Sequence, residues 1–225
     1  MEFGVNFDWM EHFICDKCVE GVIRGEYGLT HVEENKMESI IKKLYNTYKK
    51  EGLECPEQHF IKAADIEKDM LIDLLGNEQN EFMDFYLNFQ PSDLPRLACN
   101  CTFLDIKAMV EENTDFEPGC YLRKCGIYTF ALTIGGNAVC IDINSGNIYI
   151  CDHGLVMQDF DTDDIVINSG LVPCDVYNSF DVSGEIPFSY ENIIICMDKI
   201  EDSFITFIEN IVDGKYMDLE KFITY

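Results

Sequence analysis

His153 is the histidine best placed for chemistry in this sequence, because it follows Cys151 and Asp152 at the end of a run of strand-forming residues. Alternate side chains share one side of an extended chain, so we expect Cys151 and His153 to face the same way. A thiol beside an imidazole can act as a nucleophile when a third group orients the base. Cys140 is a second candidate for the thiol, but the sequence offers no evident third group. A cysteine-dependent enzyme is therefore the function class with the weakest support.

Two cysteine pairs have the residue types of a zinc site. Cys15 and Cys18 have the Cys-x-x-Cys spacing of a ligand pair, and Cys99 with Cys101 could complete a set of four. The second pair is spaced as Cys-x-Cys, however, and the two pairs are too far apart in the sequence for a zinc ribbon. We therefore expect free thiols at these positions, no metal site and no cofactor.

Carboxylates recur between Asp159 and Asp164 at the spacing that begins a calcium-binding loop. The pattern then fails, because the sixth position of such a loop is glycine and here is Asp164, and the twelfth is glutamate and here is Gly170. The segment is either a solvated acidic loop or a surface that, with Asp152 and His153, presents negative charge to a basic partner. The second interpretation predicts six partner-binding residues: Asp152, His153, Asp159, Asp161, Asp163 and Asp164.

The chain as a whole is strongly acidic. It has 16 Lys and Arg residues against 42 Asp and Glu residues, a formal net charge of −26 at pH 7. Nucleic-acid binding needs basic patches that displace counterions, so this composition argues against a nucleic-acid ligand. A basic protein would be attracted, and the long-range field would accelerate its association. Solubility is the simpler reason for an acidic surface, and charge alone does not separate the two explanations.

The composition is that of a globular domain. The chain has 225 residues, of which 47% are hydrophobic, enough to bury a core within one domain of ordinary size. No apolar run approaches the about 18 residues that a membrane span needs, and the first residues lack the basic start of a signal peptide. The number of cysteines, 11, is odd, and most lie in apolar runs, which is typical of free thiols in a reducing compartment. We expect a cytoplasmic protein without a membrane partner.

Helical and strand patterns occupy different parts of the chain. Apolar residues recur at helical spacing in five segments: 37–48, 66–75, 82–87, 106–110 and 200–211. Gly76 and Gly214 have the position of C-terminal caps, and Asp105 that of an N-terminal cap. Strand-forming residues concentrate in five segments: 127–134, 139–143, 148–151, 165–167 and 193–196. The turn 144–147 joins two of these strands in a hairpin, and the whole order predicts an α+β domain.

The hairpin and its flanks carry a more specific pattern. Its residues are Gly135-Gly136-Asn137, Val139–Asp142, Gly146, Ile148–Ile150 and Asp152-His153. Downstream, Ser203 begins a helix that carries Phe204 and Phe207. This order resembles the SUKH superfamily, whose signature has glycines, a strand ending in Asp, a turn glycine, a strand with an aromatic residue, and Asp. Leu75-Gly76 and Phe85-Tyr86 are similar to an earlier stretch of that family, although its Leu-Pro and Asn-Gly pairs are missing here.

The resemblance covers about Ile61 to Gly214 and implies an α+β fold, with helices packed on a mixed, mainly antiparallel sheet. It divides the chain into an N-terminal helical extension, residues 1–60, and a SUKH-like domain, residues 61–225, which together form one compact unit. We accordingly expect that a chain without the residues up to about Glu57 keeps a folded core.

Members of this family act by binding proteins and share no catalytic residues, so the resemblance implies a non-enzymatic protein. The leading hypothesis is an immunity protein that neutralises a toxin domain, such as a nuclease, by direct binding. The alternative is an intracellular regulatory or scaffolding protein of the same fold, and a Cys-dependent or metal-dependent enzyme comes third. The expected partner is a basic protein, and the sequence does not predict the oligomeric state.

Overall fold

The computed structural model describes residues 36–77 and 79–224, and the chain divides into two compact units, Met1–Lys36 and Met37–Tyr225. The helices in the described ranges are α2 (Lys36–Lys50), α3 (Asp65–Leu75), α4 (Glu81–Phe89), α5 (Ile106–Thr114), α6 (Gly119–Leu122), α7 (Cys174–Tyr177), α8 (Tyr190–Cys196) and α9 (Phe204–Val212), with short 3-10 segments η1 (Pro56–His59), η2 (Arg123–Cys125), η3 (Ser169–Leu171) and η4 (Leu219–Phe222). The strands are β1 (Phe60–Ile61), β2 (Gln90–Pro91), β3 (Cys101–Phe103), β4 (Ile127–Thr133), β5 (Ala138–Asp142), β6 (Ile148–Cys151), β7 (Val156–Gln158), β8 (Ile165–Ile167), β9 (Ile186–Pro187) and β10 (Asp198–Glu201).

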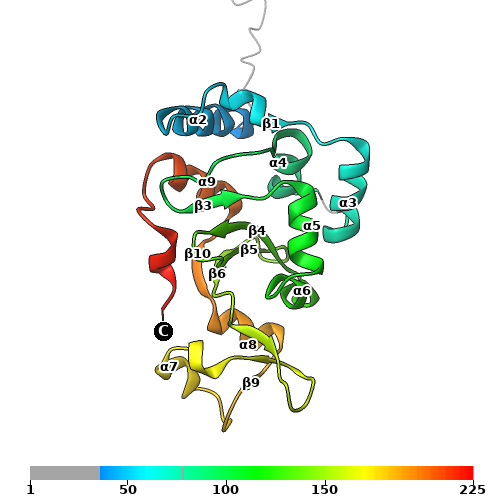
Figure 1. The fold of residues 1–225 in the computed structure, drawn as a ribbon, viewed down its shortest axis with the longest axis vertical. Helices are drawn as coiled ribbons and strands as arrows, with labels where there is room; N and C mark the ends of the chain where they lie inside the picture. The colour runs from blue at the N-terminus through cyan, green and yellow to red at the C-terminus, as the bar shows by residue number, and fades with distance from the viewer. Residues whose placement is uncertain (1–35, 78, 225) are drawn as a thin grey trace, which may run out of the picture. The chain divides into compact units, whose positions relative to one another are not determined.

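A five-stranded sheet in the order β10-β6-β5-β4-β3 forms the centre of the second unit (Figure 1). The α+β class predicted from the sequence is confirmed. Every pairing between described strands is antiparallel, so the mixed sheet that the family resemblance implied is not found in this part of the chain. Strands β4, β5 and β6 follow one another through short turns, and antiparallel pairing is what such connections produce. The other two pairs have long connections: β3 reaches β4 through α5 and α6, and β6 reaches β10 through the segment that contains β7, β8 and β9.

The central sheet is buried on both faces. In β5, Val139 and Ile141 belong to one hydrophobic core, whereas Ala138 and Cys140 belong to another. Successive side chains of a strand point to opposite faces, so this alternation assigns one core to each face. Strand β6 alternates in the same way.

Helices α2, α4, α5 and α9 supply the first core, which is centred on aromatic rings. Phe130 is at its middle, at a point where the register between β4 and β5 shifts between Thr129 and Ala131. The amide of Asn113, buried on α5, accepts from the Thr129 N–H at 2.8 Å and donates to the Thr129 carbonyl at 2.8 Å. Asn113 therefore satisfies the main-chain N–H and carbonyl of Thr129, a residue of β4 that has no partner in β3.

The division of the chain differs from the predicted one. Ile40, Ile41, Leu44 and Tyr48 of α2 are at most 2% exposed and lie in the first core. The boundary therefore falls at Lys36–Met37 and not at residue 60, because the apolar stripe of α2 completes the same core as the sheet. This placement removes the basis for expecting a folded core in a chain that begins after Glu57. Residues 1–35 lie outside the described part of the chain.

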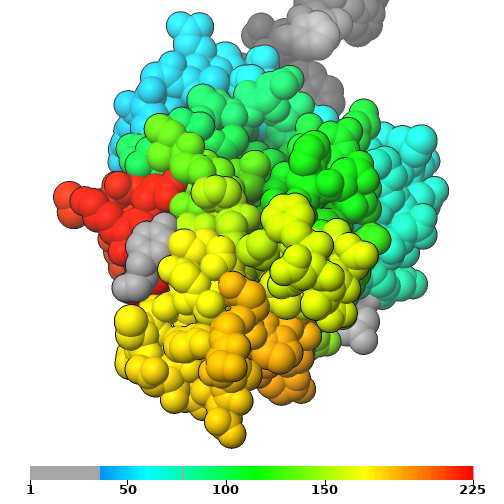
Figure 2. All heavy atoms as spheres, turned by 60° about the horizontal axis from the view of Figure 1, so that its bottom comes forward, coloured from blue at the N-terminus to red at the C-terminus, as the bar shows by residue number. Residues whose placement is uncertain are grey.

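The second core lies between the central sheet and a small layer made of the sheet β7-β8-β9 with α7 and α8, the yellow and orange segments in Figure 2. The strand predicted at 165–167 is confirmed as β8. The strand predicted at 193–196 is wrong, because these residues form α8, whose N-cap Ser189 accepts from the Asn192 N–H at 3.2 Å. Ile193 and Cys196 are buried while Ile195 is 54% exposed, which is helical spacing.

Other local predictions are confirmed. Asp105 caps α5 by accepting from the Ala108 N–H at 2.8 Å, Gly76 ends α3 with φ +86°, and Ser203 caps α9. The last helix is shorter than predicted, because Ile200 belongs to β10. No helix in the described ranges has the length and apolarity of a membrane span.

The predicted hairpin is formed by β5 and β6, and its turn is stabilised by Asp142, which is fully buried. Its carboxylate accepts from the Asn144 N–H at 3.0 Å and the Ser145 hydroxyl at 2.6 Å. The Tyr190 hydroxyl donates to the same carboxylate at 2.8 Å, and this hydrogen bond raises the pKa of Tyr190 to about 12. Asp142, which ends β5, is thus a structural residue that joins the hairpin to α8.

Candidate functional site

Asp152 forms a turn between β6 and β7 and does not contribute to an exposed acidic surface. It is 8% exposed, and its Oδ1 accepts from the Gly154 N–H at 2.8 Å. The same oxygen lies 3.7 Å from Nδ1 of His153. A carboxylate that is buried and accepts a main-chain hydrogen bond stabilises its own loop, so we remove Asp152 from the predicted partner-binding set.

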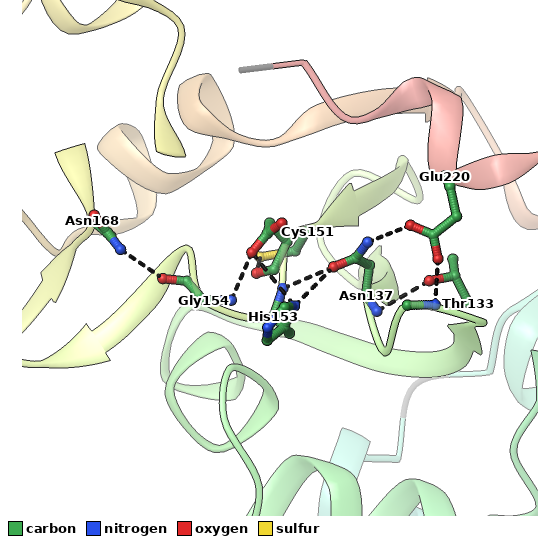
Figure 3. Close-up of polar contacts among 9 residues, drawn as sticks. Thr133, Asn137, Cys151, His153, Gly154, Asn168 and Glu220 are labelled. Atoms are coloured by element: carbon green, nitrogen blue, oxygen red, sulfur yellow. Dashed lines mark hydrogen bonds and ion pairs between the residues drawn. The ribbon is translucent and has the colours of Figure 1, made fainter. Parts of the chain in front are cut away.

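His153 is held by Asn137, to which the sequence analysis assigned no role beyond its place after Gly135 and Gly136 (Figure 3). The main-chain N–H of His153 donates to Oδ1 of Asn137 at 3.1 Å, and Nδ1 lies 3.2 Å from the same oxygen. The amide nitrogen of Asn137 donates to Glu220 at 2.6 Å, which fixes the amide so that its oxygen faces the imidazole. Because an amide oxygen only accepts, Nδ1 carries the hydrogen, and the side chain of His153 stays 65% exposed.

Glu220 joins the C-terminal segment to this cluster. Its other carboxylate oxygen accepts from the Gly135 N–H at 2.6 Å. A Cβ atom at position 135 would lie 2.8 Å from that oxygen, so a side chain there would displace the carboxylate. The preceding residues are attached to the β3 end of the sheet, since Asn100 donates to Asp218 at 2.8 Å and the Leu219 N–H donates to the Cys99 carbonyl at 3.0 Å.

Replacement of Glu220 by Ala is expected to lower the free energy of unfolding by about 1–3 kcal/mol, because the 5%-exposed Asn137 loses the acceptor of its amide. Urea titration followed by circular dichroism measures the loss, and hydrogen exchange should show faster exchange at the Gly135 amide. Glu111→Ala, at an exposed carboxylate on α5, is the matched control. Equal effects of the two variants would contradict this role of Glu220.

The thiols suggested as partners of His153 are not nucleophiles. Cys140 and Cys151 are both fully buried, and burial raises the pKa of Cys140 to about 12 and that of Cys151 well above its ordinary range. The Cys151 sulfur donates to the Asp152 carbonyl at 3.4 Å. Both thiols therefore stay protonated near neutral pH, whereas the thiolate is the reactive form.

The structure also bears on the zinc hypothesis. Cys99 and Cys101 are buried, and burial raises the pKa of Cys99 to about 11 and that of Cys101 well above its usual range. Within 36–77 and 79–224, no group of three or more His, Cys, Asp or Glu side chains could hold a metal ion. Cys15 and Cys18 lie outside the described residues.

The predicted acidic loop connects β7 and β8 in a closed hairpin. Oδ1 of Asp159 accepts from the main-chain N–H groups of Asp161 at 2.8 Å and Thr162 at 3.0 Å, and these bonds lower the pKa of the Asp159 carboxyl. The Asp159 N–H donates to the Asp164 carbonyl at 2.8 Å, and the Asp163 N–H donates back to the Asp159 carbonyl at 3.0 Å. Asp159 thus stabilises the turn, while Asp161, Asp163 and Asp164 are exposed.

Phe160 is the residue that the sequence interpretation missed. Its side chain is 95% exposed, although it lies within the hairpin that Asp159 closes. A side chain so exposed buries little apolar surface, and Phe160 belongs to neither core. The available sequence signal was a single aromatic residue inside a polar turn. We call Phe160 with Asp161, Asp163 and Asp164 the acidic hairpin tip.

The six predicted residues do not form one patch. Asp152 and His153 lie in the turn before β7, whereas the acidic hairpin tip follows the end of this strand. The three residues of β7 alone extend the chain by about 10 Å. His153 and the acidic hairpin tip are thus separate features, at opposite ends of β7.

A pocket between Phe82, Ile141 and Phe204 has a volume of about 250 Å³, below the about 300–1,000 Å³ of typical sites for small molecules. The acidic hairpin tip is therefore the described feature with the clearest potential for contact. No family model matches the chain, and no similar protein was found among the curated proteins or the solved structures.

Proposed function

We propose that this chain is a non-enzymatic, cytoplasmic protein-binding module, an immunity protein that neutralises a toxin domain by direct binding at the acidic hairpin tip. The observation that carries the proposal is the 95% exposure of Phe160 between carboxylates on a turn closed by its own hydrogen bonds. The resemblance of the β5–β6 hairpin to the SUKH signature supports the immunity role.

The tip has the composition of a contact with an apolar centre and a charged rim. Burial of one Phe side chain in a partner's pocket contributes about 1.5–3 kcal/mol, and binding energy concentrates in such anchors. Each exposed carboxylate contributes little to affinity once paired, about 0–1 kcal/mol, but the net charge of −26 accelerates encounter with a basic surface. A nuclease cleft, built to receive phosphates, is a basic surface of this kind.

The partner for the test is the toxin domain encoded by the neighbouring reading frame. Phe160→Ala is expected to weaken binding about tenfold or more, mainly through faster dissociation, because it removes the anchor and leaves the charge unchanged. A variant with Asn in place of Asp161, Asp163 and Asp164 should associate more slowly, and its association rate should depend less on salt concentration. Stopped-flow or biolayer kinetics at several salt concentrations separate the two effects.

Controls separate the tip from the overall charge. The control variant has Gln in place of Glu54, Glu57 and Glu111, and so loses the same amount of charge from exposed positions outside the β7–β8 hairpin. Phe116→Ala removes an aromatic side chain that is 55% exposed elsewhere. Equal kinetics of tip and control variants would exclude the tip from the interface. A neighbouring frame that encodes no toxin, or a toxin that this chain does not bind, would refute the immunity role.

A further inference from the structure

The turn that carries Phe160 is closed by the side chain of the residue before it. Oδ1 of Asp159 accepts from the main-chain N–H groups of Asp161 at 2.8 Å and Thr162 at 3.0 Å. The ring closed by the first of these bonds contains the whole main chain of Phe160, as in an Asx turn. The Asp159 carboxylate therefore restricts the main-chain torsions of Phe160, which set the direction of its side chain.

The main chain of Asp159 closes the base of the same turn. Its N–H donates to the Asp164 carbonyl at 2.8 Å, and its carbonyl accepts from the Asp163 N–H at 3.0 Å. A side chain of β7 supports the return of the chain, because Nε2 of Gln158 donates to the Asp163 carbonyl at 3.2 Å. Asp163 has a φ of +60°, which is uncommon for a residue with a side chain and is maintained here by these contacts.

The carboxylate of Asp159 has a different environment from those of its acidic neighbours. Among the described residues, the side chains of Asp161, Asp163 and Asp164 accept none of the hydrogen bonds of the turn, and all three are exposed. These three carboxylates are free to meet a basic partner, whereas that of Asp159 is engaged within the turn. A substitution that removes the charge of Asp159 but keeps its oxygen separates the two roles.

We propose that Asp159 is a positioning residue of the binding site, which acts through Phe160 by holding the turn in the conformation that presents the ring to the partner. This inference rests on the proposed function, in which Phe160 is the anchor of the interface. An anchor that is already ordered in the free protein binds without the cost of ordering it. When only a fraction of the molecules has the competent conformation, the apparent affinity falls by that fraction.

Asp159→Asn and Asp159→Ala are a matched pair, because both remove one negative charge and only Asn keeps an acceptor oxygen at the place of Oδ1. Asp159→Asn is expected to bind the toxin domain within about twofold of the unchanged chain, and Asp159→Ala at least about fivefold more weakly. In a chain that also carries Phe160→Ala, the effect of Asp159→Ala should fall below about twofold, because Asp159 acts through the ring. The unfolding transition of each variant checks that the fold is kept.

Hydrogen exchange in the free protein tests the positioning without a partner. The amides of Asp161 and Thr162 should exchange at least about threefold faster in Asp159→Ala, and Asp159→Asn should retain their protection. Unchanged exchange in Asp159→Ala would overturn the proposal. Equal loss of affinity in the Asn and Ala variants would also overturn it and would assign Asp159 to the charged rim.

Failure of the proposed function gives a different result. If the unchanged chain binds no toxin domain, or Phe160→Ala binds as tightly as the unchanged chain, the acidic hairpin tip is not the interface. The exchange rates then still decide whether Asp159 orders the turn around Phe160.

Discussion

A chain that lacks residues 1–57 is expected to lose its cooperative unfolding transition, whereas a chain that lacks residues 1–35 is expected to keep it. The difference between the two truncations is α2 with the loop that follows it. Leu44 and Tyr48 of this helix are 0% exposed and lie in the core on one face of the central sheet. Replacement of one buried Leu by Ala costs about 2–5 kcal/mol, so the loss of a whole buried stripe exceeds the about 5–15 kcal/mol that stabilises a typical domain.

Thermal and urea unfolding of both truncated chains, followed by near-ultraviolet circular dichroism, would measure this difference. Leu44→Ala in the full chain should lower the free energy of unfolding by about 2–5 kcal/mol. Lys49→Ala, at an exposed position of the same helix, should change it by less than about 0.5 kcal/mol. A sharp transition in the chain without residues 1–57 would support the domain boundary first predicted at residue 60.

The order of helices and strands was predictable because it depends on local signals. The caps Asp105 and Ser203 and the turn around Gly146 determine where elements begin and end, and each was read directly from residue type. The strand predicted at 193–196 failed because β-branched residues favour strands on average, whereas packing decides in a particular case. Here Ser189 caps a helix that needs only Ile193 and Cys196 to be buried.

The depth of burial was less predictable than the type of element. Ile66, Met70 and Leu74 of α3 have the helical spacing of a core face, and Met70 and Leu74 pack against the first core, yet Ile66 is 69% exposed. Nothing in the helix itself distinguishes a face that packs on the sheet from one that stays open, because that depends on elements far away in the sequence. The same reasoning applies to α2, whose stripe is fully covered by the core.

The candidate site was predicted in part. The acidic turn was identified from its carboxylates, but the exposure of Phe160 was not, because sequence does not report which way a turn residue points. The cluster of His153, Asn137 and Glu220 joins residues 83 positions apart in the chain, and no local pattern reveals such a contact. Asp152 was assigned to the interface for its charge, although a carboxylate that follows a strand can instead close the next turn, as Asp152 does.

Replacement of Phe130 by Ala is expected to be among the most destabilising single substitutions in the described part of the chain. Phe130 is fully buried, and its ring centroid lies 5.5 Å from that of Phe204, 5.6 Å from those of Phe82 and Phe207, and 6.3 Å from that of Phe103. It thereby connects α4, α9, β3 and β4. Loss of a buried Phe costs about 3–5 kcal/mol, and each edge-to-face contact with another ring adds about 0.5–1.5 kcal/mol.

Urea unfolding of this variant, followed by far-ultraviolet circular dichroism, should have its midpoint at a much lower urea concentration. The dependence of the unfolding free energy on urea concentration should be unchanged, as expected when stability changes and the compactness of the folded and unfolded states does not. Phe130→Leu should lose less, because it keeps most of the apolar volume while removing the ring contacts. Phe116→Ala, at a phenylalanine that is 55% exposed, should shift the midpoint little. If Phe130→Ala and Phe116→Ala lowered stability equally, the aromatic cluster would not be the centre of the fold, since removal of a central ring opens a cavity that distant elements cannot fill.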